Sequence, residues 1–315
     1  MKCFQVPIIR RGCLLRFTFV AAWGVSSASA VQVSTPAVDP APRFESTANE
    51  VTQIFTVLDR KGRPVSGLDS KDFSLLDDGA YVQEFKAFEQ QSETPLHIAV
   101  AIDLSGSVQE RVRYEIDVST KFLQRIIRPS DEGWIVGFNY RSYLVTDWTR
   151  ARQTLGEVTH REPRAGTAFY DAVMFACRRL ASAGTDSHRR DVLVVISDGE
   201  DNASRSAFSE TLQTVLRSGI VVLVVYTGAS FPSRELRTLA DATGGELFSA
   251  NTKRGVLNGL ARAEQAVRAQ YLIAYRPANF APDGRFRSIR LRVLRDHLRV
   301  RSRSGYYARS SVLPK

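Results

Sequence analysis

The chain has 315 residues, of which 43 are Lys or Arg and 33 are Asp or Glu, giving a formal net charge of +10 at pH 7. Its hydrophobic fraction of 43% and charged fraction of 24% exclude a disordered, collagen-like or coiled-coil chain. The length allows one large domain or two smaller ones, with a core that needs no disulfides or metals for stability.

The first 30 residues have the features of an export signal. Arg10 and Arg11 form a basic start, residues 17–25 are apolar, and Ala28-Ser29-Ala30 supplies small residues for cleavage. The apolar stretch is about half the length needed to span a bilayer, so no stable membrane anchor is expected. The mature protein is predicted to begin near Val31 and to reach the periplasm or the outside of the cell. The signal carries four basic residues and no acidic one, which leaves a net charge of +6, too mild to indicate a nucleic-acid partner.

A linker and a small β module are predicted next. Residues 31–43 contain three prolines and are predicted to be a linker. Residues 44–93 show strand-type alternation at 51–58, 73–76 and 82–88. Alternation returns at 271–275 and around 289–293. Because neither part is long enough to make a stable sheet alone, residues 44–93 and 266–310 are predicted to pair into one accessory β module.

Residues 94–265 alternate apolar strands with amphipathic helices. Strands are predicted at residues 96–102, 134–140, 143–146, 192–196, 220–226 and 246–249. Helices are predicted over 112–126, 167–181, 208–216, 236–240 and 256–267. The alternation predicts an α/β fold with a doubly wound, mostly parallel, Rossmann-like sheet inserted in the β module. Cys177, the only cysteine after the signal, falls on an apolar helix face and is predicted to be a core residue.

Polar residues gather where these predicted strands end. Asp103-Leu104-Ser105-Gly106-Ser107 follows the first apolar strand, Thr167 opens a helix, and Asp198 follows a later strand. Ligands of open α/β sheets bind at the carboxyl ends of strands, so these residues are expected at one edge. Oxygen-only ligands favour a hard divalent cation, and this donor set favours Mg²⁺, with Mn²⁺ or Ca²⁺ as alternatives.

Asp103, Ser105, Ser107, Thr167 and Asp198 resemble the metal-ion-dependent adhesion site of von Willebrand factor type A (VWA) domains. The resemblance covers roughly residues 94–265 and all five positions of the site. It implies that the two serines and the threonine ligate the ion and that the two aspartates hold it largely through water. It also implies that an Asp or Glu from a partner protein completes the coordination.

Segments outside the α/β region, such as Asp59–Leu68 and Gly305-Tyr306-Tyr307, resemble bacterial exported "VWFA-related" proteins. The function that the resemblance implies is a metal-dependent protein-binding module of the adhesion or scaffold type, not an enzyme. The identity of the partner and the oligomeric state are left open by the sequence.

Two other classes of function stay open. A serine hydrolase would use Ser105 or Ser107, but none of the four histidines, His97, His160, His188 and His297, belongs to a recognisable nucleophile motif. An anion-binding surface for a glycan, a membrane or nucleic acid would use a C-terminal β hairpin. Its outward face is predicted to carry Arg290, Arg292, Arg299, Arg301 and Arg303. Outward charges on strands usually protect sheet edges, so the metal site is preferred and no nucleic-acid partner is expected.

Overall fold

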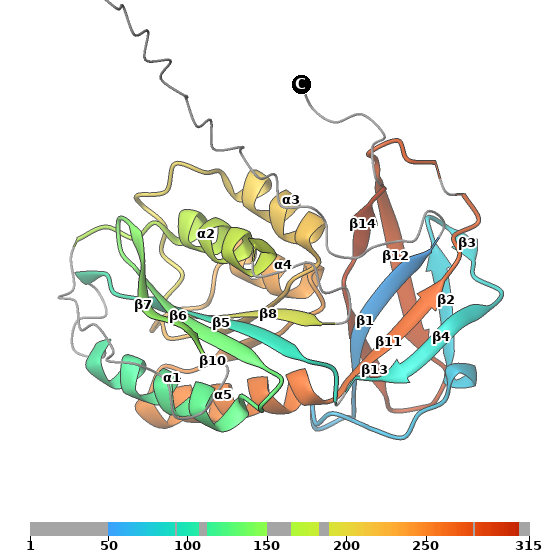
Figure 1. The fold of residues 1–315 in the computed structure, drawn as a ribbon, viewed down its shortest axis with the longest axis horizontal. Helices are drawn as coiled ribbons and strands as arrows, with labels where there is room; N and C mark the ends of the chain where they lie inside the picture. Colours follow the sequence, from blue (N-terminus) through green and yellow to red (C-terminus); the bar gives the residue numbers. More distant parts are fainter. Residues whose placement is uncertain are drawn as a thin grey trace, which may run out of the picture. The chain divides into compact units, whose positions relative to one another are not determined.

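The computed structural model describes residues 50–91, 93–106, 112–149, 165–182, 189–279 and 281–308. The predicted export signal, the predicted linker and Ser107 lie outside these residues. Within the described part, the strands form one six-stranded sheet and two four-stranded sheets (Figure 1). None of the helices described has the length and apolar character needed to cross a bilayer.

The six-stranded sheet is mostly parallel, with the order β10-β9-β8-β5-β6-β7. Only β7 at one edge runs antiparallel to its neighbour β6. All eight residues of the central strand β5 are buried, because helices cover both faces of the sheet. The strands are β5 (Leu96–Asp103), β6 (Glu132–Phe138), β7 (Ser142–Thr149), β8 (Arg190–Ser197), β9 (Val221–Tyr226) and β10 (Leu247–Ser249).

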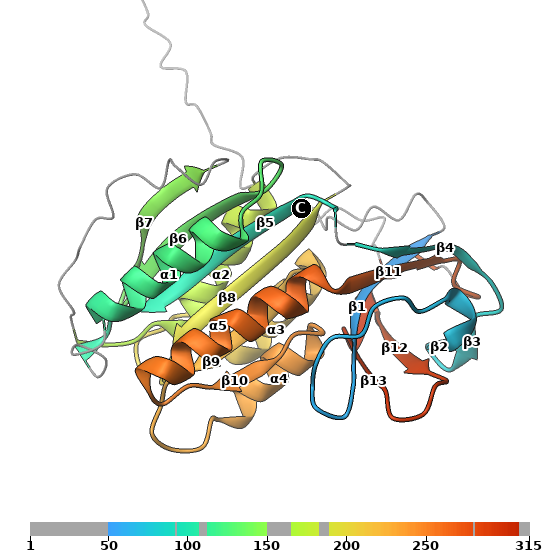
Figure 2. The ribbon, with the colours of Figure 1, turned by 90° about the horizontal axis from the view of Figure 1, so that it is seen from below.

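Five helices form the layers on the two faces of this sheet. On one face lie α1 (Val112–Ile126) and α5 (Lys253–Arg268), which Figure 2 shows in front of the strands. The other face carries α2 (Phe169–Ser182), α3 (Phe208–Ser218) and α4 (Arg234–Ala242). Cys177 is buried within the core under α2, which confirms the sequence prediction for this residue. The predicted doubly wound α/β fold is therefore confirmed.

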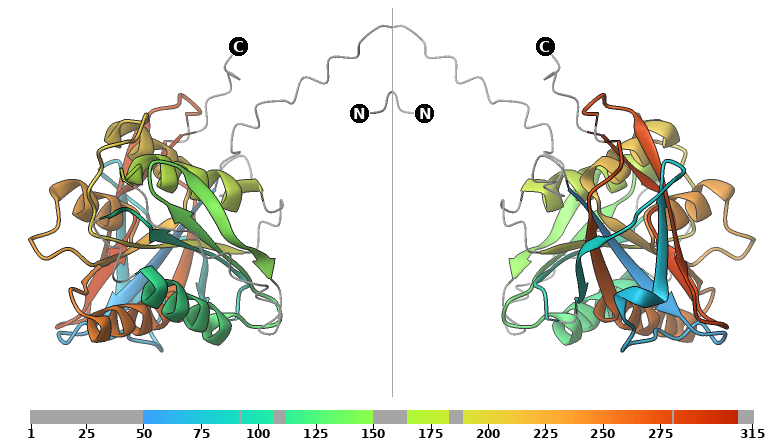
Figure 3. Two further views of the ribbon diagram at one scale, coloured as in Figure 1. Left: turned by 90° about the vertical axis from the view of Figure 1, so that its left-hand side faces the viewer. Right: turned by 90° about the vertical axis from the view of Figure 1, so that its right-hand side faces the viewer.

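Two small antiparallel sheets pack around a second apolar core (Figure 3). In the first sheet the strand order is β13-β1-β11-β4, and in the second it is β14-β12-β2-β3. Strands from before and after the α/β unit thus lie side by side, as β1 between β11 and β13 illustrates. The bounds are β1 (Val51–Leu58), β2 (Phe73–Asp77), β3 (Ala80–Tyr81), β4 (Phe85–Gln90), β11 (Gln270–Tyr275), β12 (Phe286–Val293), β13 (Arg299–Ser302) and β14 (Gly305–Tyr307).

The α/β unit enters and leaves this β part at one point. Strands β4 and β11 are antiparallel neighbours, and Gln90 pairs with Tyr271. Just beyond this pair, the Gln91 backbone N–H donates to the Gln270 carbonyl at 2.7 Å. A single residue, Ala269, separates the end of α5 from the start of β11. The chain therefore leaves the β part after β4 and returns beside its point of departure.

Three sequence predictions about local structure were wrong. The strand predicted at 82–88 begins only at Phe85, as β4, which pairs with β11, and the short strand β3, which pairs with β2 in the other sheet, was not predicted. Helix α2 begins at Phe169, so Thr167 lies in the loop before it.

The predicted arginine hairpin does not form. Strand β13 pairs with β1, whereas β12 pairs with β2 and β14 in the other sheet. Arg303 is only 8% exposed: its Nε donates to Oε1 of Gln53 at 2.9 Å and its Nη2 donates to the Thr52 carbonyl. Arg301 is partly buried as well, and its guanidinium contacts Glu246. Arg301 and Arg303 therefore do not lie on an outward face, contrary to the prediction for all five arginines.

Candidate metal centre

Asp103 ends the central strand β5 and is completely buried. Its Oδ1 accepts a hydrogen bond from the Ser105 backbone N–H at 2.9 Å, and its Oδ2 accepts one from the Ser197 hydroxyl at 2.7 Å. The Leu104 N–H donates to the Phe138 carbonyl at 2.6 Å, which ties the loop after β5 to the end of β6. Asp103 is therefore held in one orientation at the carboxyl edge of the sheet.

A second carboxylate lies near Asp103 at the same edge. Strands β5 and β8 are parallel with Ile102 beside Ile196, so the chain positions that follow, Asp103 and Asp198, come to the same end of the sheet. Burial raises the pKa of Asp103, hydrogen bonds from Ser197 and Ser105 oppose that rise, and the negative charge of Asp198 adds to it. This edge thus holds two mutually repelling carboxylates.

Thr167 is 2% exposed and is fixed by the loop that follows β8. Its N–H donates to Oδ1 of Asn202 at 2.8 Å, and its carbonyl accepts from the N–H groups of Asn202 and Ala203, each at 3.0 Å. The next residue, Ala168, donates its N–H to the Asn139 carbonyl at the end of β6. The loop carrying Thr167 is therefore attached to the ends of both β6 and β8.

Gly166 makes this attachment possible. Its φ of +87° lies in the left-handed region that favours glycine. A Cβ at this position would lie 3.3 Å from the Cβ of Tyr140, closer than most real side-chain contacts.

Acidic residues near the edge have structural roles that differ from one another. The Oδ1 of Asp198 accepts from the Glu200 N–H at 3.2 Å, which closes a local turn. Asp171 accepts from the N–H groups of Arg205 and Ser206, each at 3.0 Å. Burial works against the ionised form of Asp171, yet these backbone hydrogen bonds outweigh burial and lower its pKa. Asp171 therefore binds the 198–206 loop to α2.

Asp103, Ser105 and Asp198 come together at one edge, Thr167 is attached to the same edge through Asn202, and Ser107 lies outside the described residues. Sequence reasoning missed Ser197, whose hydroxyl donates to Asp103 and accepts from the Gly199 N–H. The one signal in the sequence was its place at the end of β8, directly before Asp198. Asn202 carried no such signal, because it lies in a loop without periodicity.

The donor set fits a hard cation. In the part of the chain described, no group of three or more His, Cys, Asp or Glu side chains could hold a metal ion. The predicted site does not require such a group, because its ligands are two carboxylates and several hydroxyls, all of them oxygen donors. The repulsion between Asp103 and Asp198 is what a bound divalent cation would relieve.

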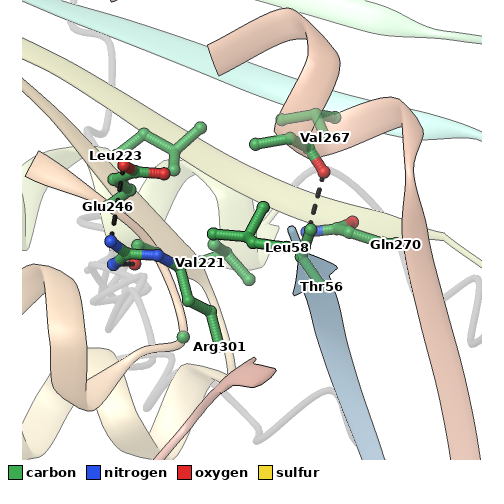
Figure 4. A pocket seen from close by; sticks show the side chains of 11 residues that line it. Thr56, Leu58, Val221, Leu223, Glu246, Val267, Gln270 and Arg301 are labelled. Carbon is green, nitrogen blue, oxygen red and sulfur yellow. Dashed lines mark hydrogen bonds and ion pairs between the residues drawn. The ribbon is translucent and has the colours of Figure 1, made fainter. Parts of the chain in front are cut away.

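A separate small cavity lies at the opposite edge of the sheet, near Val221 at the amino end of β9 (Figure 4). Its polar lining includes Gln270 and the ion pair between Glu246 and Arg301, with 3.4 Å between Oε1 and Nη2. Arg262 also contacts Oε1 of Glu246, at 2.7 Å. These charges already pair with one another, so the cavity shows no polar group directed at a ligand.

The α/β unit has the fold of a von Willebrand factor type A domain: a six-stranded sheet with one antiparallel edge strand, helices on both faces, and an Asp-x-Ser loop after the central strand.

No family model matches the chain. Two curated proteins match about half of it. Calcium-activated chloride channel regulator 3A-1 of Mus musculus is 26% identical over 165 residues, 49% of this chain and 17% of the regulator. Calcium-activated chloride channel regulator 1 of Bos taurus is 38% identical over 173 residues, 53% of this chain and 18% of the regulator.

The chain thus spans less than a fifth of the length of either regulator. Among solved structures, it is similar to a von Willebrand factor type A protein from Catenulispora acidiphila, with a TM-score of 0.47 and 12% identity over 83% of this chain and 74% of that one. It is also similar to the PilB minor pilin from Streptococcus sanguinis, with a TM-score of 0.43 and 12% identity over 57% of this chain and 62% of that one.

Proposed function

We propose that this protein is an exported, metal-dependent protein-binding module. In this proposal Asp103, Ser105, Ser107, Thr167 and Asp198 hold a divalent cation, preferably Mg²⁺, at the carboxyl edge of the six-stranded sheet. A cation bound there would offer an electrophilic position to the carboxylate of an Asp or Glu on a partner protein. The observation that carries the proposal is the buried Asp103 carboxylate beside the negative charge of Asp198.

The residues around Asp103 support binding without large rearrangement. The Ser197 hydroxyl and the Ser105 N–H fix the Asp103 carboxylate, so its orientation is set before any ligand arrives. Asn202 fixes the backbone of Thr167 in the same way. A site whose groups are already ordered loses little conformational entropy on binding.

We propose binding rather than catalysis. His97 is the second residue of β5, whereas Ser105 lies beyond its other end. His297 contacts Arg60 in the β part of the molecule. Of the histidines that the structure describes, neither is therefore placed to activate Ser105, and a serine without a base is a poor nucleophile.

Removal of the buried carboxylate tests the metal site. Mg²⁺ should raise the melting temperature of the wild-type protein, because a ligand that binds only the folded state stabilises it by about 2.7 kcal/mol at a hundred times its dissociation constant. Asp103→Ala should abolish most of this shift in a thermal unfolding assay with and without Mg²⁺. Asp117→Ala is the control, since Asp117 is an exposed carboxylate on α1 that pairs with Lys121. A wild type that shows no shift with Mg²⁺, Mn²⁺ or Ca²⁺ would contradict the proposal.

Thr167→Ala separates binding of the metal from binding of the partner. It leaves both carboxylates in place, so part of the Mg²⁺ shift should persist, while capture of the partner should weaken more strongly. The assay is a pull-down of exported proteins in Mg²⁺, repeated in EDTA, with the wild type and both site variants. Capture that EDTA leaves intact would place the partner surface elsewhere.

A further inference from the structure

The outer face of the sheet β14-β12-β2-β3 carries two exposed arginines of β12. The burial pattern of β12 alternates, with Phe286, Ser288, Arg290 and Arg292 outward. Strand β12 pairs with β14 through residues 286–288 and with β2 through residues 289–293. Arg290 and Arg292 therefore lie on the segment of β12 that is paired with β2, and their side chains stand on the outer face of the sheet.

Within the four strands of this sheet, no acidic side chain lies on the outer face. The only acidic residue in its four strands is Asp77, whose side chain is buried on the inner side, where Oδ2 accepts from the hydroxyls of Tyr275 and Tyr306. Within the described residues, neither Arg290 nor Arg292 makes an ion pair, unlike Arg287 on the inner side, which contacts Asp78 and Asp283. The outer face thus presents two exposed, hydrated guanidinium groups that are free to contact an anionic ligand.

Aromatic rings flank the two arginines. Tyr81 is 64% exposed on β3, in a cross-strand row with Leu76 and Arg290. At the far end of β12, Phe286 is 41% exposed and packs edge-on against Tyr307, with ring centroids 5.2 Å apart. Arg217 of α3 lies 4.4 Å from the centroid of the Tyr307 ring. The face therefore combines accessible ring surfaces with guanidinium groups.

We propose that this outer face binds a linear acidic polysaccharide. Guanidinium groups pair bidentately with carboxylates, and exposed aromatic rings offer flat apolar surfaces against which sugar rings can stack. From Phe286 to Arg292 the strand extends about 20 Å, and Tyr81 lies two strands, about 10 Å, from Arg290. These dimensions suit several units of a polymer better than one small anion.

Other polyanions fit the face less well. A single-stranded nucleic acid would need a wide basic groove along its backbone, whereas the whole chain after its predicted signal has a net charge of only +6. An acidic peptide supplies carboxylates but no succession of rings for Tyr81 and Phe286. The site is also separate from the candidate metal centre, so it should need no divalent cation.

The test measures binding of polygalacturonate oligomers to the full chain by isothermal titration calorimetry in EDTA. Arg290→Gln with Arg292→Gln should weaken binding more than tenfold, and Tyr81→Ala several-fold. The control is Arg113→Gln with Arg254→Gln, which removes two exposed arginines from α1 and α5 and should change affinity less than twofold. Melting temperatures of all variants should match the wild type, because each substituted side chain is exposed.

Several outcomes would overturn the proposal. No binding by the wild type, or an equal loss in the two double variants, would remove the face as a site. Tighter binding of oligo-dT or polyglutamate than of polygalacturonate would assign it to another class of ligand. Binding that EDTA or Asp103→Ala abolishes would belong to the metal centre, so failure of this inference and failure of the proposed function give different results.

Discussion

Asp191 is a buried carboxylate at the amino edge of the six-stranded sheet, in β8. Its Oδ1 lies 3.3 Å from Nε of Arg189 and 3.9 Å from Nδ1 of His97, whose other ring nitrogen faces Glu132 at 3.8 Å. Burial raises the pKa of Asp191 to about 6, although Arg189 and His97 oppose the rise. The folded protein therefore holds a proton on Asp191 in a pH range where the unfolded chain, with a pKa of about 3.9, has lost it.

This difference makes the free energy of unfolding depend on pH. Between about pH 4 and pH 6 the folded state binds more protons, so stability falls as the pH rises through that range and stays lowered above it. A shift of this size corresponds to about 3 kcal/mol at neutral pH. Asp191→Asn should flatten the dependence in denaturant unfolding curves recorded from pH 4 to pH 7.

The relevant quantity for Asp191→Asn is the slope of the free energy of unfolding against pH, because loss of the partner of Arg189 lowers that free energy at every pH. Asp117→Asn changes an exposed carboxylate and should leave the slope unchanged. Equal slopes for the wild type and Asp191→Asn would show that Asp191 does not titrate in this range.

At the scale of residues, the sequence predicted site residues only where polar side chains lie at or just beyond the end of a buried strand. Asp103, Ser105 and Asp198 could be predicted because buried parallel strands deliver their last residues to one edge. The hydroxyl of Ser197 was missed because its role depends on the register between two strands. Asn202 could not be predicted, since the loop that brings it to Thr167 has no repeating pattern.

At the scale of elements, strand β13 and the bridge after it carry a buried arginine that joins two parts of the β core. Arg303 donates to Gln53 and to the Thr52 carbonyl on β1, and its guanidinium lies 5.8 Å from the centroid of the Tyr306 ring. Burial lowers the pKa of Arg303, while Tyr275, Tyr306 and Asp77 act in the opposite direction. The guanidinium therefore matters for packing of this core, not for contact with a ligand in solvent.

Replacement of this arginine should destabilise the protein. Arg303→Met keeps an apolar stem but leaves the buried Gln53 side chain and the Thr52 carbonyl without the guanidinium that donates to them, a loss that typically costs about 3 kcal/mol. Arg292→Met, on the exposed face of β12, should change the free energy of unfolding by less than about 0.5 kcal/mol. Urea denaturation of both variants measures this difference, and similar values for the two would contradict the role given to Arg303.

The elements of the six-stranded sheet could be predicted close to their observed bounds, whereas those of the β part could not be paired correctly. A parallel strand buried on both faces is a continuous apolar run, which Val192 to Ile196 illustrates. Alternation in an antiparallel strand indicates which side chains face inward but not which strand lies alongside. Strand β3 was consequently missed, and the alternation at residues 82–88 did not indicate that β4 belongs to a different sheet from β2 and β3.

At the scale of the whole molecule, the β part depends on strands from both ends of the described chain. Deletion of residues 270–315 removes β11 from between β1 and β4 and takes away β12, which pairs with β2. Residues 51–90 should then become sensitive to protease while residues 96–268 stay resistant. Limited proteolysis with mass spectrometry tests this, with deletion of residues 309–315 as a control that removes no described strand. Protection of residues 51–90 in the longer deletion would show that they fold without β11.

The point where the α/β unit joins the β part has an evolutionary and an engineering consequence. Because Gln91 and Gln270 are hydrogen-bonded neighbours, the whole α/β unit occupies the position of a turn between two adjacent antiparallel strands. A hairpin accepts loops of very different lengths, because closure entropy grows only slowly with loop length. An ancestral β sandwich could therefore have acquired the α/β unit as a cassette in one step, and a short Asn-Gly turn between Gln90 and Tyr271 is the graft that would restore that sandwich alone.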